Sequence, residues 1–147
     1  MGLTRTNSRV LIGAVVVMTA LLMRVWWDYF GPNSIPHQTI QLQLKLFGSS
    51  IYEYHAKTGR WPSGFDDLAG TSLPEQNPSW RAMGSTIVII WRQDLKPDPK
   101  ANPGVLLAYH NGGLFSQLGR VWVCWGDLST EYVKDEVLRT LLSTGGK

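Results

Sequence analysis

A run of apolar residues near the N-terminus most constrains how this chain can fold. Residues 10–23 carry no charge, and two tryptophans, a tyrosine and a phenylalanine follow Arg24. A helix needs about 20 apolar residues to cross the hydrocarbon of a bilayer. Residues 10–30 reach that length when the Arg24 side chain extends to the headgroups, as an arginine near a helix end does. We therefore predict a transmembrane helix over residues 10–30.

A cleaved signal peptide is the alternative reading of this segment. The sequence after the apolar run contains no pair of small residues at cleavage-site spacing, which favours an anchor that is retained. Positive charge before the run exceeds the charge after it, where Arg24 is offset by Asp28. The positive-inside rule then places residues 1–9 in the cytoplasm and residues 31–147 outside. The predicted membrane-interface anchors are Arg5, Arg9, Arg24, Trp26, Trp27 and Tyr29.

The basic net charge does not indicate a nucleic-acid partner. The chain has 147 residues and a formal charge of +3, of which residues 1–30 supply two charges. Residues 31–147 carry eleven Lys and Arg against ten Asp and Glu, so the remaining domain is nearly neutral. Because a phosphate backbone is bound through a concentrated basic surface, we expect no nucleic-acid binding.

The next segment has two competing patterns. Residues 40–46 alternate apolar and polar side chains, which is typical of a strand. Apolar residues over 40–54 also recur at helical spacing and form one stripe: Ile40, Leu44, Phe47, Ile51 and Tyr54. The helical pattern is the longer one, and Gly59 supplies a stop after it. We predict a helix over residues 36–57, with Pro36 in its first turn after Ser34.

Shorter elements follow. Ser63 and Asp66 indicate a short helical turn ending at Gly70, and residues 71–85 are typical of a loop. Strands are predicted over residues 86–92, 105–110 and 120–125, and a closing helix over 133–143, with Val137, Leu138, Leu141 and Leu142 on its inner face. The fold class is α+β: a transmembrane helix, then a long amphipathic helix on a small antiparallel sheet of three to four strands, with a short C-terminal helix.

Residues that carry catalytic chemistry are sparse. The three histidines, His37, His55 and His110, do not stand at metal-ligand spacing within one element, and we expect the adjacent Asp66 and Asp67 to stabilise a helix N-terminus. The single cysteine, Cys124, lies in an apolar strand and has no partner for an internal disulfide. No phosphate-binding glycine motif or nucleophile elbow is present. We predict a protein that is not an enzyme, with no cofactor and no small-molecule substrate.

One loop carries oxygen ligands. Asp94, Asp98 and Asn102 occur at positions i, i+4 and i+8 in a proline-rich segment. Oxygen ligands of this kind suit Ca²⁺, but the spacing differs from that of an EF-hand. We expect no resident metal and retain these three residues as the calcium candidate.

The predicted strand over residues 120–125 is apolar on both faces. Val121, Val123 and Trp125 share one face, while Trp122 and Cys124 share the other. Such a strand is covered on both sides, either by loops of its own chain or by a partner. Trp122 and Trp125 are therefore the candidate partner contacts.

Several short motifs resemble those of type IV pilins and type II secretion pseudopilins. A hydrophobic helix runs into an amphipathic one that ends in Tyr52-Glu53-Tyr54, then Gly59-Arg60-Trp61-Pro62, then Phe65-Asp66-Asp67-Leu68. The C-terminal part is similar through Leu107-Ala108-Tyr109, residues 121–127 and Glu131-Tyr132-Val133. The chain departs from the family at the start of the apolar helix. Ser8-Arg9-Val10-Leu11-Ile12-Gly13 stands where prepilins have Gly-Phe-Thr-Leu-Ile-Glu.

The resemblance implies a single-pass protein of the bacterial inner membrane with a periplasmic pseudopilin-like domain over residues 31–147. Its partners would be membrane lipid and other protein subunits, in homo- or hetero-oligomers of an envelope or secretion assembly. The glutamate that ends the prepilin motif is absent here, since Gly13 stands in its place. The resemblance therefore does not extend to peptidase processing or to assembly into a filament. The alternative is an accessory subunit of an unrelated membrane complex whose domain shares only the α+β shape.

Overall fold

The computed structural model describes residues 5–30, 34–111 and 119–144, and within residues 5–12, 29, 30 and 35 only the backbone. The chain divides into two compact units, Met1–Thr39 and Ile40–Lys147. The first unit contains α1, Arg5–Phe30, which includes the predicted anchor. A search of the described residues finds no helix whose length and hydropathy would let it span a bilayer. Residues 31–33, between the two predicted helices, lie outside the described residues.

Helix α2, Ile35–Thr58, confirms the helical interpretation of this segment. All five residues of the predicted stripe are buried, with Leu44 and Phe47 fully so. Leu42, which belongs only to the alternating pattern, is 59% exposed, so the strand interpretation is wrong. The helix ends at Gly59, whose N–H donates to the His55 carbonyl at 2.8 Å. Gly59 has φ +74°, a conformation that favours glycine at a helix C-terminus.

Four antiparallel strands form one sheet in the order β1-β2-β3-β4. Their bounds are Ile87–Ile89 for β1, Leu106–His110 for β2, Arg120–Trp125 for β3 and Thr130–Lys134 for β4. Consecutive strands are neighbours throughout, as in a meander. The α+β class and the antiparallel sheet are confirmed, but β1 is shorter than the predicted 86–92.

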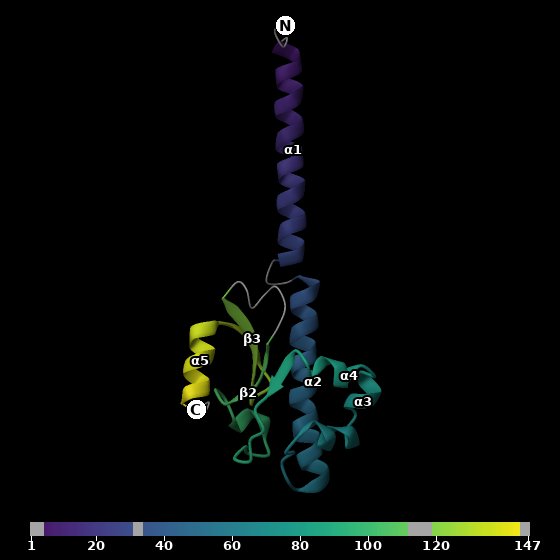
Figure 1. Cartoon of the computed structure of the whole chain (residues 1–147), viewed down its shortest axis with the longest axis vertical. Coiled ribbons are helices and arrows are strands. Elements are labelled where there is room, and N and C mark those ends of the chain that lie inside the picture. The colour runs from purple at the N-terminus through teal and green to yellow at the C-terminus, as the bar shows by residue number, and fades with distance from the viewer. Residues whose placement is uncertain (1–4, 31–33, 112–118, 145–147) are drawn as a thin grey trace. The chain divides into compact units, whose positions relative to one another are not determined.

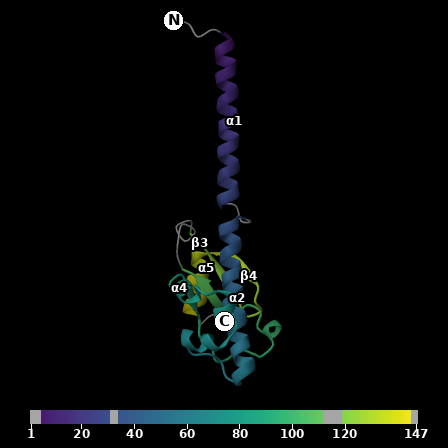
Figure 2. The ribbon, with the colours of Figure 1, turned by 90° about the vertical axis from the view of Figure 1, so that its right-hand side faces the viewer.

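The chain itself covers both faces of this sheet. Side chains of α2 pack with Trp122 and Cys124 on one face, and Val121 and Val123 pack with Leu138 on the other. Leu138 belongs to α5, Asp135–Ser143, which follows β4 directly. Figure 1 shows α2 and α5 on opposite sides of the strands, and Figure 2 views the same sheet with α2 in front.

The C-terminal helix is confirmed, with two corrections. It begins at Asp135 because the predicted first residue, Val133, pairs with Val121 as part of β4. Its inner face is also narrower than predicted. Leu138 is buried and Leu141 half-buried, whereas Val137 and Leu142 are 45% and 43% exposed.

The segment between α2 and β1 is more ordered than predicted. A 3-10 helix, η1, spans Phe65–Gly70, and residues 71–85, expected to be a loop, contain α3, Leu73–Gln76, and α4, Trp80–Met83. The cap of η1 also differs from the prediction, since Gly64 and not Ser63 precedes its first residue. Ser63 instead donates its N–H and hydroxyl to Asp67 Oδ2, at 2.7 and 3.0 Å.

Candidate functional site

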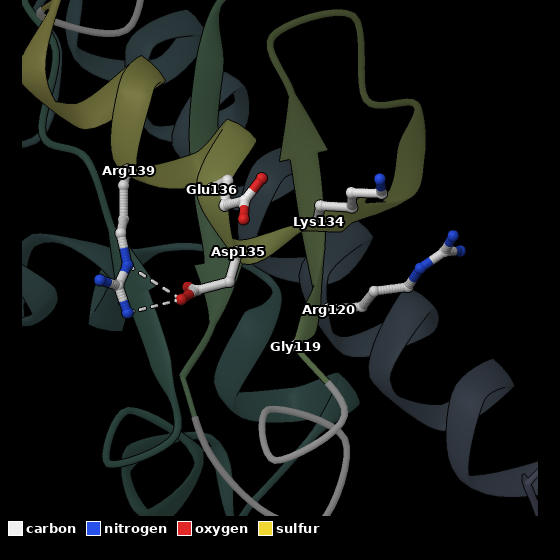
Figure 3. A pocket seen from close by; sticks show the side chains of 6 residues that line it. All are labelled: Gly119, Arg120, Lys134, Asp135, Glu136 and Arg139. Atoms are coloured by element: carbon white, nitrogen blue, oxygen red, sulfur yellow. Dashed lines mark hydrogen bonds and ion pairs between the residues drawn. The ribbon is translucent and has the colours of Figure 1, made fainter.

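A charged hollow of about 500 Å³ lies where β3 begins and β4 passes into α5. Figure 3 shows the six residues that line it: Gly119, Arg120, Lys134, Asp135, Glu136 and Arg139. The backbone brings them together, because the Asp135 N–H donates to the Gly119 carbonyl at 3.0 Å. Gly119 adopts φ +69°, which a residue with a side chain rarely does.

The charges around the hollow do not converge on one point. Asp135 accepts hydrogen bonds from Arg139 one helical turn later, at 2.7 and 2.9 Å. The Arg120 guanidinium lies 5.8 Å from the Tyr132 ring centroid. In Figure 3 the side chains of Arg120 and Lys134 extend to the same side, and the dashed lines join only Asp135 and Arg139. General acid–base or nucleophilic catalysis needs groups within hydrogen-bond reach of one reacting atom, so this geometry suits a polar contact surface.

Sequence reasoning missed this hollow, although its residues left a signal. Lys134, Asp135, Glu136 and Arg139 form a charged cluster around the start of the predicted closing helix. The missing information was that Gly119 and Arg120 come to the same place, which depends on the β3–β4 register.

The three calcium candidates serve the packing of their own loop. Asp94 pairs with Arg92 at 2.9 Å, and Asp98 Oδ1 accepts the Lys100 N–H at 3.0 Å. Asn102 is buried; its Oδ1 accepts the Lys96 N–H at 2.9 Å, and its Nδ2 donates to Lys96 O and Asp98 O. Each of the three candidate side chains therefore accepts at least one hydrogen bond from a donor nearby in the same segment.

The histidines lie in different settings. His37 is buried near the start of α2, and His55 stacks on Trp61 with ring centroids 3.9 Å apart. His110 ends β2, where burial lowers its pKa. Among the residues that the structure describes, no three His, Cys, Asp or Glu side chains gather closely enough to hold a metal ion.

The single thiol is part of the core. Cys124 is fully buried on the α2 side of the sheet, and burial, aided by the charge of Asp127, raises its pKa to about 12. A thiol is nucleophilic only as the thiolate, so we expect this residue to be unreactive in the folded protein.

The two candidate partner contacts are in different environments. Trp122 is 7% exposed and stacks on Tyr132 with ring centroids 5.1 Å apart, inside the cluster formed with α2. The prediction that Trp122 contacts a partner is therefore wrong, because the chain's own helix covers that face. Trp125 is half-buried beside the α5 cluster, and its Nε1 donates to Glu131 Oε2 at 3.1 Å.

The predicted membrane-interface residues lie on α1. Arg24 Nε and Asp28 Oδ2 are 4.0 Å apart and form an i,i+4 ion pair. Trp26 and Trp27 are 60% and 65% exposed. The side chains of Arg5, Arg9 and Tyr29 lie outside the described part of the structure.

Comparison with known proteins gives no relative. No protein-family model matches the chain, and neither a curated protein nor a solved structure shows significant similarity to it.

Proposed function

We propose that this chain is a membrane-anchored, non-enzymatic interaction protein resembling a pseudopilin. In this proposal α1 holds the chain in the bacterial inner membrane, and the α+β domain contacts partner subunits of an envelope or secretion assembly on the periplasmic side. The observation that carries the proposal is the apolar surface of α1.

In the described part of α1, apolar side chains point in every direction around the helix axis. Val15, Val16, Val17 and Met18 are consecutive and each is 58–62% exposed. Successive residues of a helix are about 100° apart, so these four side chains cover every direction. A helix lying flat on a membrane keeps one polar face, whereas a helix that is apolar all round is surrounded by other apolar material. Lipid hydrocarbon supplies that environment.

The outer domain offers a mixed surface of the kind that protein partners use. Val137 and Leu142 are exposed on α5, and three charged residues of the hollow, Asp135, Glu136 and Arg139, belong to the same helix. Interfaces outside permanent complexes are about as apolar as ordinary protein surface and have polar rims. This surface, together with charges that do not converge, supports recognition of a protein in preference to turnover of a substrate.

The proposal is tested by intact mass and crosslinking of the membrane-extracted protein. Crosslinks from the α5 surface to other envelope proteins would support it. A ladder of self-crosslinked species, with a mass lacking the residues before the apolar run, would indicate a processed filament subunit. A monomer with no crosslinked partner in native membranes would overturn the interaction role. The identity of a crosslinked partner separates a secretion assembly from an unrelated membrane complex.

A further inference from the structure

The ion pair on α1 stands among exposed apolar side chains, Leu21, Leu22, Met23 and Val25. Arg24 and Asp28 are 82% and 71% exposed, and their nearest charged atoms are 4.0 Å apart. In water an exposed pair of this kind contributes almost nothing to stability. We infer that the Arg24–Asp28 pair sets the depth at which α1 sits in the bilayer. This inference rests on the proposed function of α1 as an anchor.

The uncharged part of α1 is too short to cross the bilayer by itself, so the pair enters the hydrocarbon region when the helix spans it. Residues 10–23 are uncharged, and at 1.5 Å per residue they span only about 21 Å. The hydrocarbon core is about 30 Å thick. Residues 10–30 span about 31 Å, so an anchor that fills the hydrocarbon places Asp28 near its margin and the Arg24 backbone about 9 Å inside it, where the long arginine side chain reaches toward the headgroups. A shorter insertion would leave the bilayer thinned or the helix too shallow.

The spacing of the two residues lowers the free-energy cost of placing their charges at this depth. Charged residues inside membranes are costly when alone and usually pair with one another. Residues four apart lie on one face of a helix, so Asp28 offsets the Arg24 charge without any second helix. Their attraction strengthens as the surrounding dielectric falls. Trp26 and Trp27, which lie between the two residues in sequence and are exposed, suit the headgroup level.

The experiment measures depth in the full chain. A nitroxide is attached at Leu22→Cys, a 65% exposed position, in phosphatidylcholine vesicles, and its collisions with oxygen and with a water-soluble nickel chelate are compared. Cys124 does not interfere, since it is fully buried. A second label at Val16→Cys, 61% exposed, reports whether α1 moves as one body.

Asp28→Asn removes the partner and leaves Arg24 charged. We expect Arg24 to be drawn toward the headgroups, so that the nickel-to-oxygen collision ratio at Leu22→Cys rises by about twofold or more. The exchange of both residues, Arg24→Asp with Asp28→Arg, keeps a pair and should keep the original depth. In the double neutral variant, Arg24→Gln with Asp28→Asn, the label at Leu22→Cys should not move toward water.

The outcomes separate this inference from the proposed function. If Asp28→Asn leaves both labels at the original depth, the pair does not set the depth and the inference is overturned. If the exchange variant shifts as much as Asp28→Asn does, pairing is not the cause, which also overturns it. If the unsubstituted chain does not associate with vesicles at all, the anchor itself fails.

Discussion

The hydroxyl of Tyr52 on α2 accepts a hydrogen bond from Asn102 Nδ2 at 2.9 Å and donates one to the Gly126 carbonyl at 2.6 Å. These bonds join residues 50 and 74 positions apart in the chain. They connect the long helix, the proline-rich loop and the turn after β3 at one buried point. Since Asn102 Nδ2 also donates to Lys96 O and Asp98 O, this amide fastens the proline-rich loop that contains the calcium candidates to the core.

Tyr52→Phe should destabilise the domain by about 1–3 kcal/mol, because it leaves a buried carbonyl and a buried amide each without one partner. Chemical denaturation of the two proteins measures the difference. Tyr54→Phe is the matched control, since its hydroxyl lies 3.3 Å from Asp67 and 3.2 Å from Arg60 near the surface. Equal losses from the two substitutions would contradict a special role for Tyr52.

A close approach between α2 and the turn after β3 gives a second prediction. A Cβ at Gly48 would lie 2.8 Å from Leu128 Cδ2 and 3.3 Å from Cys124 Sγ. Leu128 Cδ2 is the end of a side chain that can turn, but Cys124 Sγ and Leu107 Cδ2, at 3.3 and 3.4 Å, belong to fully buried residues that have little room to move. Gly48→Ala should therefore cost about 1–3 kcal/mol of unfolding free energy, despite the better helix propensity of alanine.

The neighbouring residue provides the control for Gly48→Ala. Ser49 is exposed on the same helix, so Ser49→Ala should leave stability within about 0.5 kcal/mol. Adding Leu128→Ala to Gly48→Ala removes the colliding group, and the double variant should lose less than the sum of the two single losses. Strict additivity would mean that the contact is not the cause.

Glu53 predicts a dependence of stability on pH. Burial opposes ionisation of this carboxylate, but hydrogen bonds from Lys57 and from the hydroxyl and N–H of Ser72 outweigh it and lower the pKa from 4.5 to about 2. A carboxyl whose pKa is lowered on folding stabilises the folded state above its unfolded pKa. This stabilisation should be complete above pH 4.5 and disappear as the pH falls toward 2.

Glu53→Gln isolates this contribution. The variant should unfold about 1 kcal/mol more easily than the original at pH 7, a value that allows for screening by solvent at this surface-facing pair. Denaturation curves recorded between pH 7 and pH 2.5 should show that the difference in unfolding free energy between the two proteins shrinks as the pH falls. A difference that stays constant across this range would show that Glu53 acts through packing alone.

Cys124 should resist thiol reagents in the folded protein. Its burial and its pKa of about 12 leave almost no thiolate at pH 8, so alkylation should be at least about 100-fold slower than in denaturant. Mass spectrometry after timed exposure to iodoacetamide measures both rates. Comparable rates with and without denaturant would place the thiol at the surface.

Much of the fold could be predicted from local pattern. The stripe on α2 was identifiable because five buried residues follow helical spacing over fifteen positions, and only a helix puts them on one face. The strands over residues 105–110 and 120–125 were identifiable from their β-branched and aromatic runs. The short helices α3 and α4 were not, because single turns depend on tertiary packing, as with Leu73 and Trp80 in the core.

Pattern alone could not say what covers a sheet face. Trp122 and Cys124 were recognised as an apolar face, but the choice between a partner and the chain's own elements depends on where α2 lies. Likewise, which side of α5 faces the sheet depends on how β4 passes into the helix at Asp135; Leu138 faces inward, whereas Val137 and Leu142 are exposed. The charged hollow depends on pairing between strands, which no local window contains.

Alkaline carbonate extraction of membranes containing the full chain tests the central claim of an α1 anchor most directly. We predict that the unsubstituted chain stays with the membrane pellet. The double substitution Val17→Arg with Leu21→Arg, at two exposed positions one turn apart, should release the chain into the supernatant with the outer domain still folded. Release of the unsubstituted chain by carbonate would contradict the account.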